Sequence, residues 1–113
     1  MCGENMEYLG KVEKFVLGYI WFDYFGKIYF SRGSQEAEEF LADTIASDIA
    51  KDQRMHSKIS SALKEAIKKL KEYWMIEVSG YEVSLTSYGE QVAKALNKDE
   101  YNKIKEEIAS GRI

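Results

Sequence analysis

The sequence predicts one mainly helical domain with a small β-hairpin, a fold of the α+β class. Three observations support this prediction. Long segments place apolar residues at helical spacing, two short β-prone runs flank a Ser-Gly pair, and the 113 residues include no proline that would interrupt a helix. Since 45% of the residues are apolar, one continuous core can be built. We therefore expect a single domain over 1–113.

A first helix is expected from Glu7 to Phe25, with Gly26 as its stop. Its apolar residues lie on nearly every side of the helix rather than in one stripe. This helix should therefore be buried on more than one face. Two ways of covering the second face remain open: a partner subunit, or a short strand together with the C-terminal helix.

A short strand is expected next, over 27–32, where Ile28 and Phe30 alternate with polar neighbours. Ser34 is then expected to cap a second helix that runs to about Lys51. The first turn of this helix is rich in carboxylates, which the helix dipole favours. An acidic second helix is therefore predicted.

A third helix is expected from Ser57, its N-cap, to Trp74, after a polar turn over 52–56. At about 100° per residue, its aliphatic side chains fall on one side, which should face the core. The far side collects hydroxyl and basic residues, which are Ser57, Ser61, Lys64, Lys68 and Lys71. The two predicted helices also differ in charge. Residues 51–71 include seven basic residues and two acids, whereas residues 34–50 include five acids and no basic residue.

Two β-prone runs, 75–79 and 81–85, should form a hairpin around a tight turn. Thr86 is expected to cap a fourth helix and Asp99 a fifth. The fifth helix, over 99–110, could take part in dimerisation. The predicted order is therefore helix, strand, helix, helix, hairpin, helix, helix.

The composition argues against a metal centre, a nucleophilic active site and a membrane span. Cys2 and His56 are the only residues of their types, so a zinc site of three or four N/S ligands cannot be assembled, and any catalytic triad would have to use His56. The longest apolar stretch, 15–25, is far shorter than the roughly 20 residues that cross a bilayer. No secretory signal is recognisable. We expect no enzyme activity, no cofactor, no metal and a cytoplasmic location.

The order of the elements and several short stretches resemble the winged helix-turn-helix of archaeal and bacterial MarR-like and PadR-like regulators. The stretches are Ile49-Ala50-Lys51, Ile59-Ser60-Ser61-Ala62-Leu63-Lys64, Leu70-Lys71-Glu72-Tyr73-Trp74-Met75-Ile76, and Leu85-Thr86 followed by Gly89. The resemblance covers the chain from Ser34 to Leu96. One departure is the connection between Lys51 and Ile59, which looks about one helical turn longer than is usual in these families.

In such regulators, the helix that matches 57–74 enters the major groove and the hairpin that matches 76–85 touches the DNA backbone or minor groove. Arg54 is added as a phosphate contact because the guanidinium fork fits that group. His56 could hydrogen-bond a phosphate when protonated, but an ordinary turn residue is the favoured interpretation. The expected DNA-binding residues are Arg54, Ser57, Lys58, Ser61, Lys64, Lys68, Gly80 and Tyr81.

The resemblance implies a transcriptional regulator that binds double-stranded DNA as a homodimer, with two copies spaced for two half-sites. The first and last helices should supply the dimer contact, through Phe15, Tyr19, Trp21, Phe22, Tyr101, Ile104 and Ile108. Other interpretations remain open. A lysine-rich face is often only a solvated one, and aromatic residues of the first helix could line an effector pocket. The net charge of −3 fits a winged-helix protein-interaction module better than a DNA-binding protein.

Overall fold

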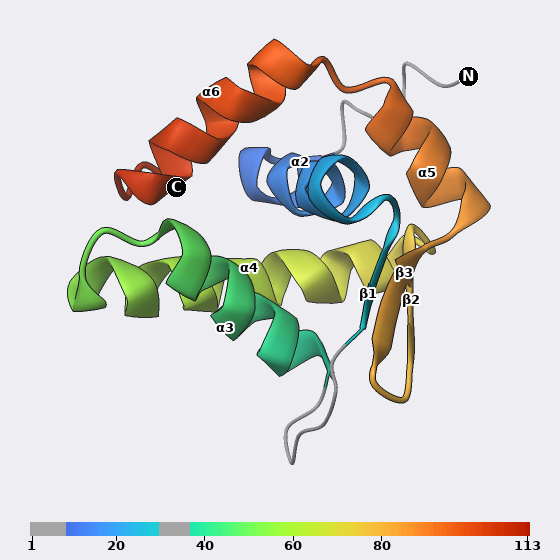
Figure 1. Cartoon of the computed structure of the whole chain (residues 1–113), viewed down its shortest axis with the longest axis horizontal. Coiled ribbons are helices and arrows are strands. Elements are labelled where there is room, and N and C mark those ends of the chain that lie inside the picture. Colours follow the sequence, from blue (N-terminus) through green and yellow to red (C-terminus); the bar gives the residue numbers. More distant parts are fainter. Residues whose placement is uncertain (1–8, 30–36) are drawn as a thin grey trace.

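The computed structural model describes residues 9–29 and 37–113. Within these ranges the protein is mainly helical with a small antiparallel sheet, as the sequence predicts (Figure 1). The elements are α2 (Lys11–Gly18), the π-helical turn η1 (Tyr19–Asp23), β1 (Lys27–Tyr29), α3 (Ala37–Ile49), α4 (Gln53–Glu72), β2 (Ile76–Ser79), β3 (Glu82–Leu85), α5 (Ser87–Lys94) and α6 (Lys98–Ala109). The predicted order of helices and strands is confirmed for the described residues.

The sheet has the strand order β1-β3-β2, so the strand that precedes α3 pairs with the second strand of the hairpin. Ile28 of β1 lies opposite Val83 of β3, which lies opposite Val78 of β2. These three side chains share the inner face of the sheet, where Ile28 and Val83 are buried. The other face bears polar side chains such as Lys27 and Ser84, which lie opposite each other. One face of the sheet therefore joins the core.

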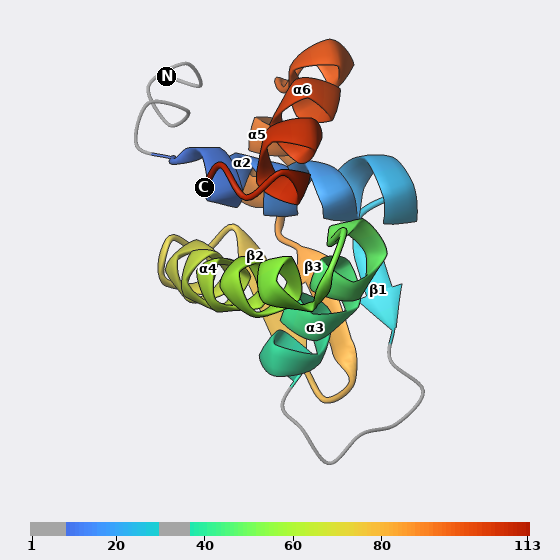
Figure 2. The same cartoon turned by 90° about the vertical axis from the view of Figure 1, so that its left-hand side faces the viewer.

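α2 lies in the middle of the molecule, between α4 on one side and α5 and α6 on the other (Figures 1 and 2). Phe15, Val16 and Ile20 have no exposed surface. The sequence left open whether a partner subunit or the same chain covers the second face of this helix. The chain covers it itself, because α5 and α6 fold back over α2.

Tyr101 of α6 fixes this arrangement. Its ring stacks on Phe15 with centroids 5.7 Å apart and an interplanar angle of 14°. The same ring lies directly against the backbone of α2, since a Cβ atom on Gly18 would be 2.5 Å from the Tyr101 ring. Only glycine permits so close an approach here, which explains a glycine in the last turn of an apolar helix.

α4 begins five residues earlier than expected, at Gln53 rather than directly after Ser57. The carboxylate of Asp52 accepts a 2.9 Å hydrogen bond from the Met55 amide and is the N-cap. The expected Ser57 cap and the expected turn over 52–56 are therefore wrong. The connection to α3 is only residues 50–52, so the extra helical turn suspected in the sequence is part of α4 itself.

Two further boundaries differ from the prediction. The first helix does not continue as an α-helix to Phe25, because it changes to η1 at Tyr19. α6 begins one residue before Asp99, since the Asn97 side chain accepts a 2.7 Å hydrogen bond from the Asp99 amide and is the true cap. In contrast, the expected cap of α5 is confirmed, because the Thr86 hydroxyl accepts a 3.0 Å hydrogen bond from the Gly89 amide.

Several expectations fall outside the described residues. These are the start of the first helix near Glu7, the strand beyond Tyr29 and the Ser34 cap of the second helix. At the other end, α4 stops at Glu72, so Trp74 lies in the turn that leads to β2 rather than in the helix.

Candidate nucleic-acid interface

α3 packs along α4, and this pair forms the surface on which the sequence places the DNA contacts. Aliphatic side chains such as Leu41, Ile45 and Leu63 fill the space between the two helices. Three polar links join their edges. From the start of α4 to its end, they are Ser47 with His56 (3.2 Å), Asp43 with Ser60 (3.0 Å) and Glu38 with Lys71 (3.1 Å). The orientation of α4 on α3 is thus fixed along its length.

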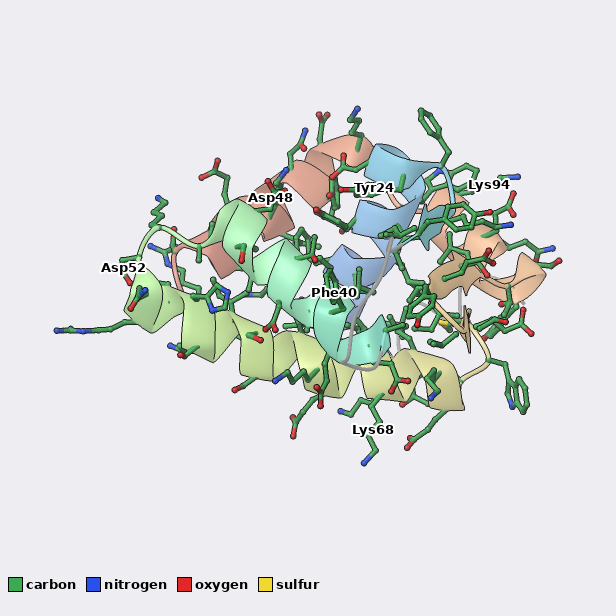
Figure 3. All side chains as sticks on the ribbon, turned by 60° about the horizontal axis from the view of Figure 1, so that its bottom comes forward. Tyr24, Phe40, Asp48, Asp52, Lys68 and Lys94 are labelled. Atoms are coloured by element: carbon green, nitrogen blue, oxygen red, sulfur yellow. The ribbon has the colours of Figure 1, made fainter. Side chains whose placement is uncertain are left out.

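The side of α4 that points away from the core is exposed and mainly basic, with Glu65 and Glu72 beside Lys68 and Lys69 at its C-terminal end. Five of the predicted DNA-binding residues lie along it and are here called the α4 stripe: Arg54, Ser57, Ser61, Lys64 and Lys68. Figure 3 shows Lys68 projecting from α4 away from the rest of the protein. Since the helix begins at Gln53, Arg54 belongs to the stripe itself rather than to a turn that precedes it.

Among the residues that the structure describes, the cationic groups of the α4 stripe have no ion-pair partner. Within 9–29 and 37–113, no carboxylate lies within ion-pairing distance of Arg54, Lys64 or Lys68. Lys71, which the sequence placed on the same side, differs because its ammonium group lies 3.1 Å from the Glu38 carboxylate. The charge of the stripe is therefore available to an external anion.

Lys58 is exposed, but its ammonium group reaches toward the C-terminal residues. A Cβ atom on Gly111 would lie 3.9 Å from the Lys58 Nζ atom. The periodicity of α4 alone could not reveal this direction, because it depends on where α6 ends. Lys58 therefore stands at the flank of the α4 stripe, not within it.

α3 brings carboxylates close to this surface, as the acidic composition of the segment implies. Two of them are already engaged, since Glu38 pairs with Lys71 and Asp43 accepts a hydrogen bond from Ser60. Asp48 lies on the far side of α3 from Lys68 (Figure 3). The acidic character of α3 is therefore partly neutralised and partly directed away from the stripe.

His56 lies in the first turn of α4 and not in a loop, contrary to the expectation from the sequence. It is half-buried, and its Nε2 atom is 3.2 Å from the Ser47 hydroxyl. Together with Asp52, Gln53 and Ser57, the two residues line a shallow open depression of about 590 Å³ at the junction of α3 and α4. The histidine therefore helps to join the two helices.

The hairpin tip is open to solvent, as a DNA contact would require. Gly80 and Tyr81 form the two-residue loop between β2 and β3. Gly80 has a φ of +59°, in the left-handed region that glycine adopts without strain. Apart from its chain neighbours, no atom of the described residues lies within 4 Å of the position of a Cβ there. Tyr81 is 56% exposed. Both residues are accessible at the end of the hairpin.

Most of the residues expected at a dimer contact lie in the core of one chain. Five of the seven are buried within a single chain, and these are Phe15, Tyr19, Tyr101, Ile104 and Ile108. They are covered because α6 packs on α2 within the same chain. Only Trp21 and Phe22 keep part of their surface. The aromatic residues of the first helix thus serve mainly as core.

Two buried tyrosines form polar links that the sequence did not reveal. Tyr19 donates a 3.3 Å hydrogen bond to Asp48 of α3, and Tyr101 donates a 3.1 Å hydrogen bond to Asp23 at the end of η1. Burial, reinforced by these hydrogen bonds and the nearby carboxylates, raises the pKa of both phenols above the ordinary value. Both therefore act as neutral donors, and their hydrogen bonds attach η1 to α3 and to α6.

Aromatic residues at two exposed turns are a second feature that periodicity did not reveal. Phe25 is 88% exposed with a φ of +58°, and Trp74 is 76% exposed with a φ of +61°. Among the described residues, these two are the non-glycine residues with positive φ. Each follows the end of a helix, where glycine is the usual left-handed residue.

Among residues 9–29 and 37–113, no group of three or more His, Cys, Asp or Glu side chains is placed to hold a metal ion. In the same ranges, the helices are too short or too polar to cross a membrane. Comparison with known proteins gives no relative, because no family model matches the chain and neither the curated proteins nor the solved structures contain a significant match. Function must therefore be inferred from the α4 stripe and its surroundings.

Proposed function

We propose that this chain is a winged helix-turn-helix protein that binds double-stranded DNA and regulates transcription. Two features of the fold support this proposal. α3 and α4 are joined by a connection of only residues 50–52, as a helix-turn-helix requires, and a hairpin follows directly after α4. In this proposal α4 is the recognition helix and the β2–β3 hairpin is the wing.

The observation on which the proposal depends is the α4 stripe. An α-helix with its side chains is about 10–12 Å across and fits a major groove about 12 Å wide. Arg54, Lys64 and Lys68 are exposed on one side of such a helix and lack an ion-pair partner among the described residues. Their charges would neutralise phosphates and release counterions, while Ser57 and Ser61 could bond to phosphates or base edges.

The overall charge of −3 does not conflict with this proposal, because DNA binding depends on the local charge of the docking surface. Lysine and arginine lie on the stripe, whereas Asp48 of α3 faces away from it (Figure 3). We expect weak binding to DNA of arbitrary sequence and a strong dependence on salt.

The test is fluorescence anisotropy with a labelled mixed-sequence duplex at several salt concentrations. Lys64→Glu and Lys68→Glu should each weaken binding at least tenfold at low salt and lower the slope of log K against log salt by about one per lost phosphate contact. Lys103→Glu is the matched control, because it makes the same charge change on an exposed lysine of α6. If all three variants bind equally well, the α4 stripe does not contact DNA.

A protein-interaction module is the second candidate, and the net negative charge favours it. Such a module would use the same exposed side of α4 against an acidic protein surface. Failure of the wild-type chain to bind any duplex at low salt would support this candidate over the first.

A further inference from the structure

The β2–β3 hairpin carries the wrong charge for a contact with the DNA backbone. Its residues, 76–85, include Glu77 and Glu82 and no lysine or arginine. Lys27 of the neighbouring strand β1 already pairs with Glu82 at 3.8 Å and lies 5.8 Å from the centre of the Tyr29 ring. Because phosphates repel carboxylates, a hairpin laid on a DNA strand would weaken binding. Another part of the chain is therefore better suited to hold the backbone beside the α4 stripe.

The end of α6 lies beside the start of α4, at the opposite end of that helix from the hairpin (Figure 1). Gly111 has a φ of +87° and ends α6 in a Schellman motif, in which the Arg112 amide donates a 2.9 Å hydrogen bond to the Glu107 carbonyl. Gly111 packs closely on α4, since a Cβ atom there would lie 2.8 Å from the Met55 sulfur. The Lys11 ammonium donates a 3.0 Å hydrogen bond to the Arg112 carbonyl. The backbone of Arg112 is thus fixed beside the first turns of α4.

Two exposed cations lie at this junction and are here called the basic corner: Lys58 and Arg112. The Lys58 ammonium would lie 3.9 Å from a Cβ atom on Gly111, the residue before Arg112. Among the described residues, neither cation has a carboxylate within ion-pairing distance. Arg54 is exposed one turn before Lys58 on the same helix, so the basic corner continues the α4 stripe.

The acids around the basic corner are offset by other groups. Asp52 caps α4 by accepting a hydrogen bond from a backbone amide, and the Glu107 carboxylate pairs with Lys11 at 2.9 Å. A depression of about 300 Å³ between α3 and α6 is lined by two further acids and by two lysines. These are Asp48, Glu106, Lys51 and Lys105. The basic corner therefore keeps a local excess of positive charge, in contrast to the hairpin.

The basic corner lies on the side of α4 that faces away from α3. Lys58 is two positions from both His56 and Ser60, which contact α3, and two positions correspond to about 200° around a helix. A helix in the major groove has one strand of the backbone on each side. We propose that the basic corner, rather than the hairpin, binds the DNA backbone on this side of α4. The inference rests on the proposed function and replaces its wing contact with Lys58 and Arg112.

This placement shifts the DNA toward the beginning of α4. The acids of the exposed side, Glu65 and Glu72, lie in the second half of the helix, and the hairpin glutamates follow them. The expected contact surface runs from the basic corner through Arg54 to Lys64 and Lys68. It stops short of the hairpin.

The experiment is fluorescence anisotropy with a labelled mixed-sequence duplex, on the full chain and at several salt concentrations. Arg112→Gln and Lys58→Gln should each weaken binding about threefold to tenfold at low salt and lower the slope of log K against log salt by about one. Arg112→Lys keeps the charge and should bind almost as the wild type does. Lys98→Gln is the matched control, because it removes the same charge from an exposed lysine at the other end of α6. It should leave the slope unchanged.

Two hairpin variants test the other half of the proposal. Glu77 and Tyr81 are both exposed, so Glu77→Gln and Tyr81→Ala should fold normally in thermal melts and bind DNA as the wild type does. A hairpin that lies on the backbone gives a different result, because Glu77→Gln then tightens binding by more than Lys98→Gln weakens it, and Tyr81→Ala weakens it.

The outcomes separate this inference from the proposed function. Binding that falls in Lys64→Glu and Lys68→Glu but not in Arg112→Gln or Lys58→Gln overturns the basic corner and leaves the proposed function standing. The tightening by Glu77→Gln described above also overturns the basic corner alone. A wild-type chain that binds no duplex at low salt overturns both proposals.

Discussion

The hydroxyl of Tyr101 donates a hydrogen bond of 3.1 Å to the carboxylate of Asp23, so one side chain of α6 is tied to the turn that ends the first helix. The ring of the same residue stacks on Phe15 and lies against the backbone of Gly18. α6 is therefore part of the core of a single chain, and the structure gives no reason for this helix to swing out toward a partner.

Replacing Tyr101 should reduce the sensitivity of the fold to alkaline pH. Burial, and then the Asp23 charge, raises the pKa of the folded phenol above its ordinary value of 10.0. The unfolded phenol ionises first, so the stabilisation is complete below about pH 10 and is lost as the pH rises further. Tyr101→Phe should therefore flatten the decline of the urea midpoint between pH 9 and 11, at a cost of about 1 kcal/mol at neutral pH. If the urea midpoint of Tyr101→Phe declined as steeply as that of the wild type between pH 9 and 11, ionisation of Tyr101 would not be a cause of the alkaline loss of stability.

The hydrogen bond between Ser60 and Asp43 should contribute measurably to the packing of α4 on α3. Ser60 is only 6% exposed, and its hydroxyl donates to the half-buried Asp43 carboxylate at 3.0 Å. Ser60→Ala should lower the free energy of unfolding by about 1–2 kcal/mol, because the carboxylate loses its donor. Asp43→Asn keeps an acceptor oxygen and should cost less. A double-mutant cycle with no coupling between the two positions would contradict the interaction.

The start of α4 can be tested with two alanine substitutions. Asp52→Ala removes the N-cap and should cost about 1 kcal/mol in urea unfolding. Ser57→Ala lies inside the helix on its exposed side, where alanine is the better helix former, and should be neutral or slightly stabilising. The reverse result would place the start of the helix at Ser57, as the sequence alone suggested.

Two glycines should respond differently to alanine. A Cβ atom at Gly89 would lie 1.9 Å from the carbonyl oxygen of Met75, so Gly89→Ala has to displace backbone and should cost more than about 2 kcal/mol. A Cβ atom at Gly80 would have no described residue other than its chain neighbours within 4 Å, so the φ of +59° is what opposes a side chain there. Gly80→Ala should therefore cost about 1–2 kcal/mol. Equal costs in thermal or urea unfolding would show that α5 does not pack on the Met75 backbone as described.

The sequence predicted the elements well because its periodic segments are long and distinct. Boundaries were wrong where two capping residues compete. Asp52 and Ser57 are both good N-caps, and so are Asn97 and Asp99. In the structure, the first turn of α4 also places His56 Nε2 3.2 Å from the Ser47 hydroxyl of α3. Such a contact between two helices is not visible in local sequence.

The helical periodicity alone predicted which side of α4 is exposed, because the side opposite its buried aliphatic residues faces away from the core. The partners of its lysines could not be predicted. Lys71 meets Glu38, 33 residues away, and Lys58 is directed by the position of the C-terminus. Likewise, the composition of the first helix showed that it is buried on several sides but not that α5 and α6 of the same chain bury it.

The π-helical turn at Tyr19–Asp23 changes the angle between successive side chains at the end of the first helix. A π-turn holds one more residue than an α-helical turn, so every side chain beyond it is rotated by about 100° from the direction that a regular helix would give. Phe25 follows this turn and lies in the left-handed region at a φ of +58°, so its direction depends on both features of the backbone. Deleting one residue within this turn would leave the composition almost unchanged and present a different set of rings to solvent.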